Sequence, residues 1–335
     1  MKTKFCASSS FVPLVMLLGA IAGLAVMGLV FCWVCPDMSH DARGYVSRWH
    51  FKRQVAWNVV GMTALCVAAV IGWKRWLKAA PFLFAGWVAL WFAAHIRQSV
   101  DGSSTIVLIG PISLEVWALF PVAFALLAAW LRERYGIRTR RILFIFGIVV
   151  FAVTACELIT DETRLNRLVS FISGDSSPAI SPSACARSFV QCQAGRAFAQ
   201  AKWLSSSDTE ILRSLPGKMT YSMPASSAVM FGKWFMSVAG GFFAVIAFCL
   251  AWLWRVTADR AKRAFILVVG LGIIVPAVFG VCQCLGIVPM SYMSVPLVSN
   301  VATAVLSSWL GAGILISVCV GRGEFVWSRA EYLSE

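Results

Sequence analysis

Long apolar runs, separated by short polar and mostly basic segments, fill most of the chain. About eight of these runs are long enough to cross a hydrocarbon core of about 30 Å, which takes about 20 helical residues. Backbone groups cannot stay unpaired in lipid, so such runs predict helices. The expected spans are about 11–35, 55–73, 80–96, 112–131, 142–158, 226–254, 264–285 and 296–320. The pattern therefore predicts an all-α polytopic membrane protein, with residues 1–335 forming one transmembrane domain.

One polar interruption is much longer than the others and covers residues 159–225. It is rich in Ser, Pro and Gly and contains the run SGDSSPAISPS, which is typical of irregular backbone. Within it, residues 185–203 carry enough Ala, Gln and Phe to form a short helix at the membrane surface. Long ordered loops are often functional, so this segment is a candidate for chemistry.

Composition and charge agree with the lipid environment. Hydrophobic residues make up 59% of the chain and charged residues 13%, against about a quarter charged in soluble domains. The formal net charge of +14 does not indicate nucleic-acid binding, because the cations lie in short clusters between apolar runs. With the N-terminus inside, sixteen Lys and Arg fall on inner segments and five on short outer loops. We therefore expect both termini in the cytoplasm and 159–225 outside it.

The residues typical of redox, metal or proton-relay sites form no recognisable pattern. Most of the eleven cysteines lie in apolar runs, where a thiol is usually a small hydrophobe. Cys185 and Cys192 share the outer loop, and their pairing stays open. Acidic residues deep in the spans, which a proton relay needs, are nearly absent, and Lys233 can extend outward along its helix. The sequence predicts no metal site and no cofactor.

Four polar elements between the spans resemble one known family. Residues 51–54 read FKRQ at the start of the second span. Residues 100–104 read VDGSS and continue to LIGPISL at 108–114. Residues 164–171 read RLNRLVSF, and 286–299 begin GIVPMS and end VPLVS. Their order and sidedness are similar to those of the SEDS family (shape, elongation, division and sporulation proteins of the FtsW/RodA type).

The resemblance implies a fold and an activity. SEDS proteins usually have ten helices, and this chain has one span, 142–158, where the family has three. The implied activity is polymerisation of lipid-linked peptidoglycan precursor at the outer face of a bacterial plasma (inner) membrane, beside a transpeptidase or other division or elongation protein. Such a reaction needs a carboxylate base and groups that stabilise the departing pyrophosphate, a divalent metal ion among them if the chain is active. The residues matched to the family's substrate site are Asp101, Gly102, Arg164, Arg167, Ser170, Pro289, Pro296 and Ser299.

The sequence departs from the family pattern at the catalytic position. One alignment places Val229 at the family's aspartate, and the other places Tyr221 there. Neither side chain can act as a carboxylate base. The family's loop tryptophan falls at Ile106 and a further glutamate at Ala118. Asp208 and Glu210 are the candidate replacements for the base.

Three hypotheses follow from these observations. The first is a divergent SEDS-like protein of cell-wall synthesis, cell division or cell shape that lacks the usual catalytic aspartate and acts as a scaffold or partner. The second is an active glycosyltransferase with a rearranged site, in which Asp208 or Glu210 faces Arg164 and Arg167. The third is a transporter of lipids or small molecules, which an inverted repeat would favour.

Overall fold

Long helices occupy all eight of the expected apolar runs. The computed structural model describes residues 3–35, 49–101, 106–109, 112–160, 169, 172, 189–204, 215, 222–288 and 294–320. Its long helices are α1 (Thr3–Val34), α2 (Trp49–Val70), α3 (Trp73–Asp101), α4 (Val116–Tyr135), α5 (Thr139–Thr160), α11 (Lys233–Val256), α12 (Arg260–Cys284) and α13 (Ala302–Cys319). Two shorter helices, α8 (Phe189–Gln200) and α10 (Met223–Phe231), and two strands, β1 (Ile106–Ile109) and β2 (Ile112–Glu115), complete it.

Seven of these helices are long and apolar enough to span a membrane, counted over the residues that the structure describes. They are α1, α2, α3, α4, α11, α12 and α13, and α5 covers the eighth expected run. A helix of 18 residues is about 27 Å long, which matches the hydrocarbon thickness. The prediction of a polytopic, helical, multi-pass membrane protein is confirmed.

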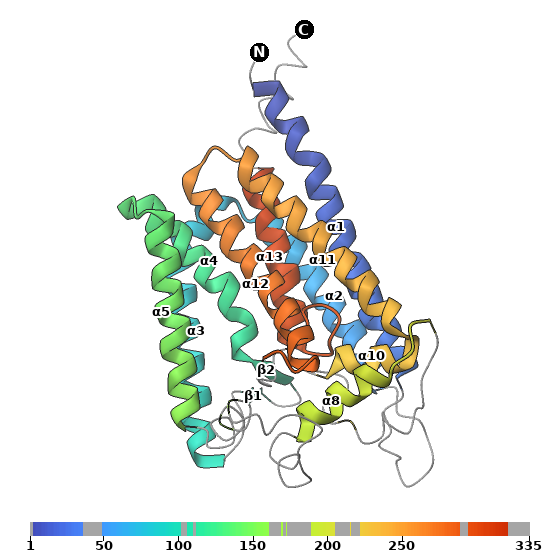
Figure 1. Cartoon of the computed structure of the whole chain (residues 1–335). Helices are drawn as coiled ribbons and strands as arrows, with labels where there is room; N and C mark the ends of the chain where they lie inside the picture. The colour runs from blue at the N-terminus through green and yellow to red at the C-terminus, as the bar shows by residue number, and fades with distance from the viewer. Residues whose placement is uncertain are drawn as a thin grey trace.

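The bundle has two unlike ends (Figure 1). At one end, α1 begins and short turns join α2 to α3, α4 to α5 and α11 to α12; we call it the turn end. At the other end lie α8, α10 and the β1–β2 hairpin; we call it the loop end. Ring contact between Trp33 and Phe51, at 4.9 Å, joins α1 to α2 near the loop end. Ser317 Oγ donates to Ile71 O at 2.8 Å and joins α13 to α2 at the turn end.

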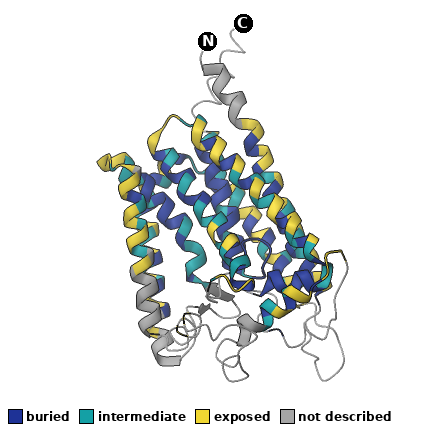
Figure 2. Cartoon of the chain, viewed as in Figure 1, coloured by how far each residue is buried: buried dark blue, intermediate teal, exposed yellow. Residues whose placement is uncertain are grey.

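Helix α13 is the most enclosed of the spanning helices, with 78% of its most apolar window buried. It packs against α2, α4 and α1 (Figure 2). Helix α5 lies on the outside of the bundle. Phe146 of α5 stacks on Phe120 of α4 at 5.6 Å, whereas Phe144 and Phe151 are 70% and 75% exposed. These exposed rings face the surface that lipid would cover, which is consistent with apolar solvent around the bundle.

Three of the expected spans differ in detail from the structure. The run 226–254 is not one helix, because Gly232 separates α10 from α11. In the run 296–320, helix begins only at Ala302. The preceding residues 294–301 form a non-helical segment, which is buried except for the half-buried Val301. The run 112–131 begins with β2, which pairs antiparallel with β1 so that Ile106 lies opposite Glu115. Hydropathy detects apolar character but does not distinguish a spanning helix from a buried loop or short strand next to it.

The expected loss of one helix pair from a ten-helix fold stays a prediction. Between α5 and α8 the structure describes only Val169 and Ile172. The short helix expected within 185–203 is present as α8.

Candidate functional site at the loop end

The described parts of three of the four family-like elements come together at the loop end (Figure 1). The FKRQ element lies in the first turns of α2. The LIGPISL element includes most of β2, and the VPLVS element is part of the segment 294–301. The RLNRLVSF element is described only at Val169. Sequence motifs more than 240 residues apart therefore form one three-dimensional cluster.

Gln54 of the FKRQ element holds the 294–301 segment in place. Its Nε2 donates to Leu297 O at 3.3 Å and to Ser299 O at 3.5 Å, and its side chain is fully buried. Leu297 has a φ of 66°, which a residue with a Cβ rarely adopts. Ser299 Oγ donates to Val295 O at 2.7 Å within the same segment. A non-helical backbone buried in a membrane protein needs such partners, because lipid supplies none.

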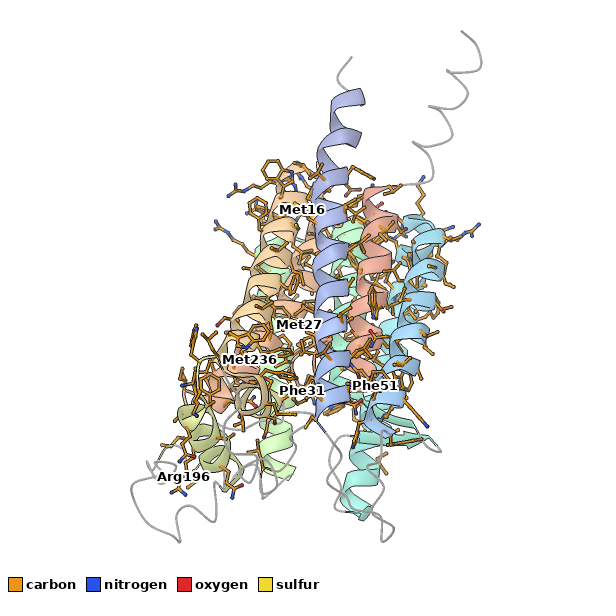
Figure 3. The ribbon with its side chains drawn as sticks, turned by 90° about the vertical axis from the view of Figure 1, so that its right-hand side faces the viewer. Met16, Met27, Phe31, Phe51, Arg196 and Met236 are labelled. Atoms are coloured by element: carbon orange, nitrogen blue, oxygen red, sulfur yellow. The ribbon has the colours of Figure 1, made fainter. Side chains whose placement is uncertain are left out.

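Close approach of α1 completes the packing of this segment. A Cβ at Gly28 would lie 2.6 Å from Leu297 O and 3.0 Å from Val298 O, so only glycine fits there without movement. Phe31, one turn further along α1, is fully buried. Figure 3 shows Phe31 and Met27 of α1 on the part of the helix that approaches the loop end, with Met236 of α11 nearby.

A second layer of polar contacts lies below the segment, between α2 and α13. Trp309 Nε1 donates to Asn58 Oδ1 at 3.1 Å, and Asn58 Nδ2 donates to Gln54 O at 2.9 Å. The Trp309 ring lies directly over Gly61, where an added Cβ would be 2.3 Å from Cδ1. Asn58 and Trp309 are 6% exposed, so these hydrogen bonds are shielded from water.

The segment also connects outward to the start of α2 and to the hairpin. Asn300 Nδ2 and His50 Nδ1 are 2.7 Å apart, and which of the two donates depends on the histidine tautomer. The backbone N–H of Glu115 donates to Thr303 Oγ1 at 3.1 Å. Gln54 Oε1 and Asn300 Oδ1 are buried and accept no hydrogen bond from any described residue. These two oxygens are the unsatisfied acceptors of the cluster.

Val229, which one alignment places at the catalytic aspartate, is fully buried in α10. Its neighbours form a small apolar cluster that joins α8, α10 and the end of α12. The members of this cluster are Ala194, Ala197, Ala201, Leu215, Ala225, Ala228, Val229 and Cys284. A carboxylate at residue 229 would therefore lie among methyl groups and a thiol, where a charge is costly.

The break between α10 and α11 is fixed by Gly232 and by Lys233. Gly232 has a φ of 95°, and a Cβ there would lie 2.5 Å from Trp203 O. The N–H of Lys233 donates to Lys202 O at 3.0 Å. Lys233 Nζ lies 3.4 Å from Ala199 O and 5.6 Å from the Phe198 ring centroid, so it extends toward α8. Arg196 of the same helix lies at the rim of the loop end (Figure 3).

Only some of the predicted site residues are within the described parts of the chain. Pro296 and Ser299 are buried in the 294–301 segment, and Asp101 is the last residue of α3. The remaining predicted residues lie outside the described residues: Gly102, Arg164, Arg167, Ser170, Asp208, Glu210, Tyr221 and Pro289. Sequence reasoning missed Gln54, Asn58 and Trp309 as structural partners. Gln54 and Asn58 are spaced four apart in α2 and therefore share one helix face, a signal that could have indicated a buried polar face.

Three carboxylate side chains are described, and Glu115 is the one at the loop end. Glu133 and Asp259 lie at the turn end. No group of three or more His, Cys, Asp or Glu that could hold a metal ion occurs among the described residues.

The fold and this loop end define a class of protein, namely polytopic helical membrane proteins with a buried, non-helical segment before the last span. No family model and no curated protein matches the sequence. Among solved structures, the chain is similar to a chain of a peptidoglycan synthase complex, solved to show how polymerization and crosslinking are coordinated (TM-score 0.64, 14% identity, 91% of this chain and 96% of that chain).

It is also similar to the rod shape determining protein RodA of Thermus thermophilus. An aspartate-to-alanine mutant of RodA aligns with a TM-score of 0.61 at 15% identity, over 91% of this chain and 96% of that chain. Unmutated RodA aligns with a TM-score of 0.58 at 14% identity, over 91% and 95%. The chain has the RodA fold, which is the fold that its resemblance to the SEDS family predicts.

Proposed function

We propose that this chain is a divergent SEDS-like protein of peptidoglycan synthesis, cell division or cell-shape control that acts as a scaffold or partner rather than as an ordinary polymerase. The observation that carries the proposal is Val229. It stands where an alignment expects the family's catalytic aspartate, and it is fully buried in a cluster of apolar side chains. The RodA fold supports the general role, and the closed surroundings of Val229 support the loss of the ordinary reaction.

The proposal includes the orientation of the chain. The loop end faces outward from the plasma membrane of a bacterium, and the turn end and both termini face the cytoplasm. The basic residues of the turns support this orientation, because cytoplasmic segments are enriched in Lys and Arg. The partner is a transpeptidase or another division or elongation protein, and lipid-linked precursor is the ligand that a retained groove would bind.

A purified-protein assay with lipid-linked disaccharide precursor tests the catalytic part. We expect no glycan polymer from the wild-type chain under conditions where an active SEDS polymerase, assayed in parallel, gives product. Polymer that disappears in Asp208→Ala, Glu210→Ala or Glu115→Ala would overturn the proposal and would support the rearranged active enzyme.

The partner is tested separately by affinity purification of the tagged chain from cells of its own organism after in vivo crosslinking. We expect a transpeptidase among the crosslinked proteins. Recovery of only transport substrates or of no wall-synthesis protein would count against a scaffold.

A further inference from the structure

Three basic turns converge at the turn end of the bundle, and they lie far apart in the sequence. They contain twelve basic and two acidic side chains. The basic ones are Lys74, Arg75, Lys78, Arg132, Arg134, Arg138, Arg140, Arg141, Arg255, Arg260, Lys262 and Arg263, which we call the basic turn face; the acidic ones are Glu133 and Asp259. Nine of the twelve basic residues are exposed and the other three are partly exposed.

Two contacts bring the three turns together. A Cβ at Gly272 of α12 would lie 2.2 Å from Pro121 Cβ of α4, so these antiparallel helices cross closely at that level. From the crossing, Tyr135 is 14 residues along α4 and Arg260 is 12 residues back along α12. These lengths correspond to rises of about 21 and 18 Å, so the two turns end at about the same height. Trp73 and Phe265, at 5.4 Å, bring the start of α3 to the start of α12.

The surface stays strongly basic because its two acidic residues face twelve basic ones. Asp259 is the N-cap of α12, and its Oδ1 accepts from Ala261 N at 2.8 Å and Lys262 N at 3.3 Å. Its negative charge is therefore directed to the helix terminus, where it stabilises exposed N–H groups. Side chains with nitrogen atoms at their tips project outward at this end (Figure 3).

Some of the cations are held in place by the backbone. Arg263 Nη2 donates to Arg255 O at 3.2 Å, Nε donates to Thr257 O, and the guanidinium lies 5.7 Å from the Trp254 ring centroid. Arg132 Nη1 donates to Ile137 O across the α4–α5 turn. Guanidinium groups that are already ordered lose less entropy when they bind an anion.

Aromatic side chains indicate at what level of the bilayer the basic turn face lies. Trp252 and Trp254 are 44% and 39% exposed on the last turns of α11. Trp130 and Tyr135 are in edge contact at 5.5 Å at the end of α4. Trp and Tyr at helix ends are typical of the headgroup region of a bilayer. The cations next to them therefore lie at the level of lipid phosphates.

We propose that the basic turn face is a binding site for the phosphodiester headgroups of anionic phospholipids. The nine arginines suit phosphate because a guanidinium binds it through two parallel hydrogen bonds. Clustered cations beside spanning helices are also the ordinary form of an anionic-lipid site. The proposal does not depend on the enzymatic state of the chain or on its partner.

Lipid retention by the purified, full-length protein tests the proposal. The protein is reconstituted in nanodiscs of phosphatidylglycerol and phosphatidylcholine, transferred to detergent, and its bound lipids are counted by native mass spectrometry. We expect the wild type to retain phosphatidylglycerol preferentially. The triple variant Arg138→Gln, Arg140→Gln, Arg141→Gln should lose about tenfold or more of this preference. A matched control removes three cations at the loop end, through Lys52→Gln, Arg196→Gln and Lys202→Gln, and should retain it.

Further variants and competitors separate the proposal from its alternatives. If the triple glutamine variant fails to fold, the Arg→Lys variant at the same positions keeps the charge and should still lose part of the selectivity, because lysine does not bind phosphate bidentately. Equal lipid retention by the wild type, turn-end and loop-end variants would overturn the proposal. So would complete displacement of the lipid by inorganic phosphate, or binding of a poly-glutamate peptide at the same face with no preference for phosphatidylglycerol.

Discussion

Trp309 of α13 donates a hydrogen bond to the side chain of Asn58 of α2 in the buried middle of the bundle, and its ring lies on Gly61 one turn further along α2. The pair joins two spans that are about 250 residues apart in sequence. Asn58 in turn donates to the carbonyl of Gln54, which holds the 294–301 segment. The loop-end geometry therefore depends on a contact that is not itself at the loop end.

Loss of the Asn58 amide should destabilise the protein. Asn58→Leu leaves Trp309 Nε1 buried without an acceptor, which costs about 1–3 kcal/mol. We expect a lower thermal unfolding midpoint in detergent, measured by tryptophan fluorescence. Trp309→Phe combined with Asn58→Leu should recover part of the loss, because neither partner is then left unpaired. A double variant that loses the full sum of the two single effects would contradict the pairing.

Gly28 should not tolerate a methyl group. Gly28→Ala places a Cβ 2.6 Å from Leu297 O, so α1 or the 294–301 segment must move. The expected cost is about 1–3 kcal/mol in unfolding free energy, as for overpacked cores. Gly19→Ala is the matched control on the same helix, because no atom lies within 4 Å of its added Cβ. A Gly28→Ala variant as stable as Gly19→Ala would mean that the close approach does not exist.

A side chain at residue 232 should also destabilise the protein, for a conformational as well as a steric reason. Its φ of 95° lies in a region that favours glycine, and Trp203 O blocks a side chain. Gly232→Ala should lower the unfolding midpoint and increase protease cleavage near the α10–α11 junction. Gly240→Ala, in the open middle of α11, should be neutral or slightly stabilising because alanine is the better helix former. Greater destabilisation by Gly240→Ala than by Gly232→Ala would exclude a strained junction.

Introducing an aspartate at residue 229 should not create a polymerase. Val229→Asp places a carboxyl group among apolar side chains, at a cost of about 2 kcal/mol or more. The variant should unfold at lower temperature and give no polymer from lipid-linked precursor. Val229→Ala separates the loss of packing from the burial of charge, and it should be the milder change. A stable Val229→Asp protein with polymerase activity would contradict this prediction. It would show that the chain retains a working active site that lacked only the carboxylate base.

The spanning helices could be predicted because lipid requires long runs of apolar residues, and such runs can be recognised in the sequence. Runs of apolar residues long enough to span, such as 264–285, became α12 with little change. The break at Gly232 was not predicted, because α10 and α11 are both apolar and their division depends on backbone contact with Trp203. The buried segment before Ala302 has the hydropathy of a helix, and only its tertiary partners, Gln54 among them, reveal that it is not one.

The site residues matched to the family stay a prediction, and the sequence did not indicate the interior of the loop end. The motifs at 51–54 and 295–299 lie in one cluster, where Gln54 donates to the carbonyls of Leu297 and Ser299. The environment of Val229 was not predictable, because its neighbours come from α8, α10 and α12, which are far apart in the sequence. Periodicity describes one helix at a time, whereas burial depends on which helices meet.

The junction at Gly232 also bears on how the protein enters the membrane during synthesis. Helix α11 has 24 residues and is about 36 Å long, so it spans the hydrocarbon core by itself. Helix α10 has nine residues, about 14 Å, and cannot. Its burial depends on α8 and α12, and α12 is made after it. We therefore expect α11 to insert as a complete span, and α10 to reach its buried position only after α12 has been translated.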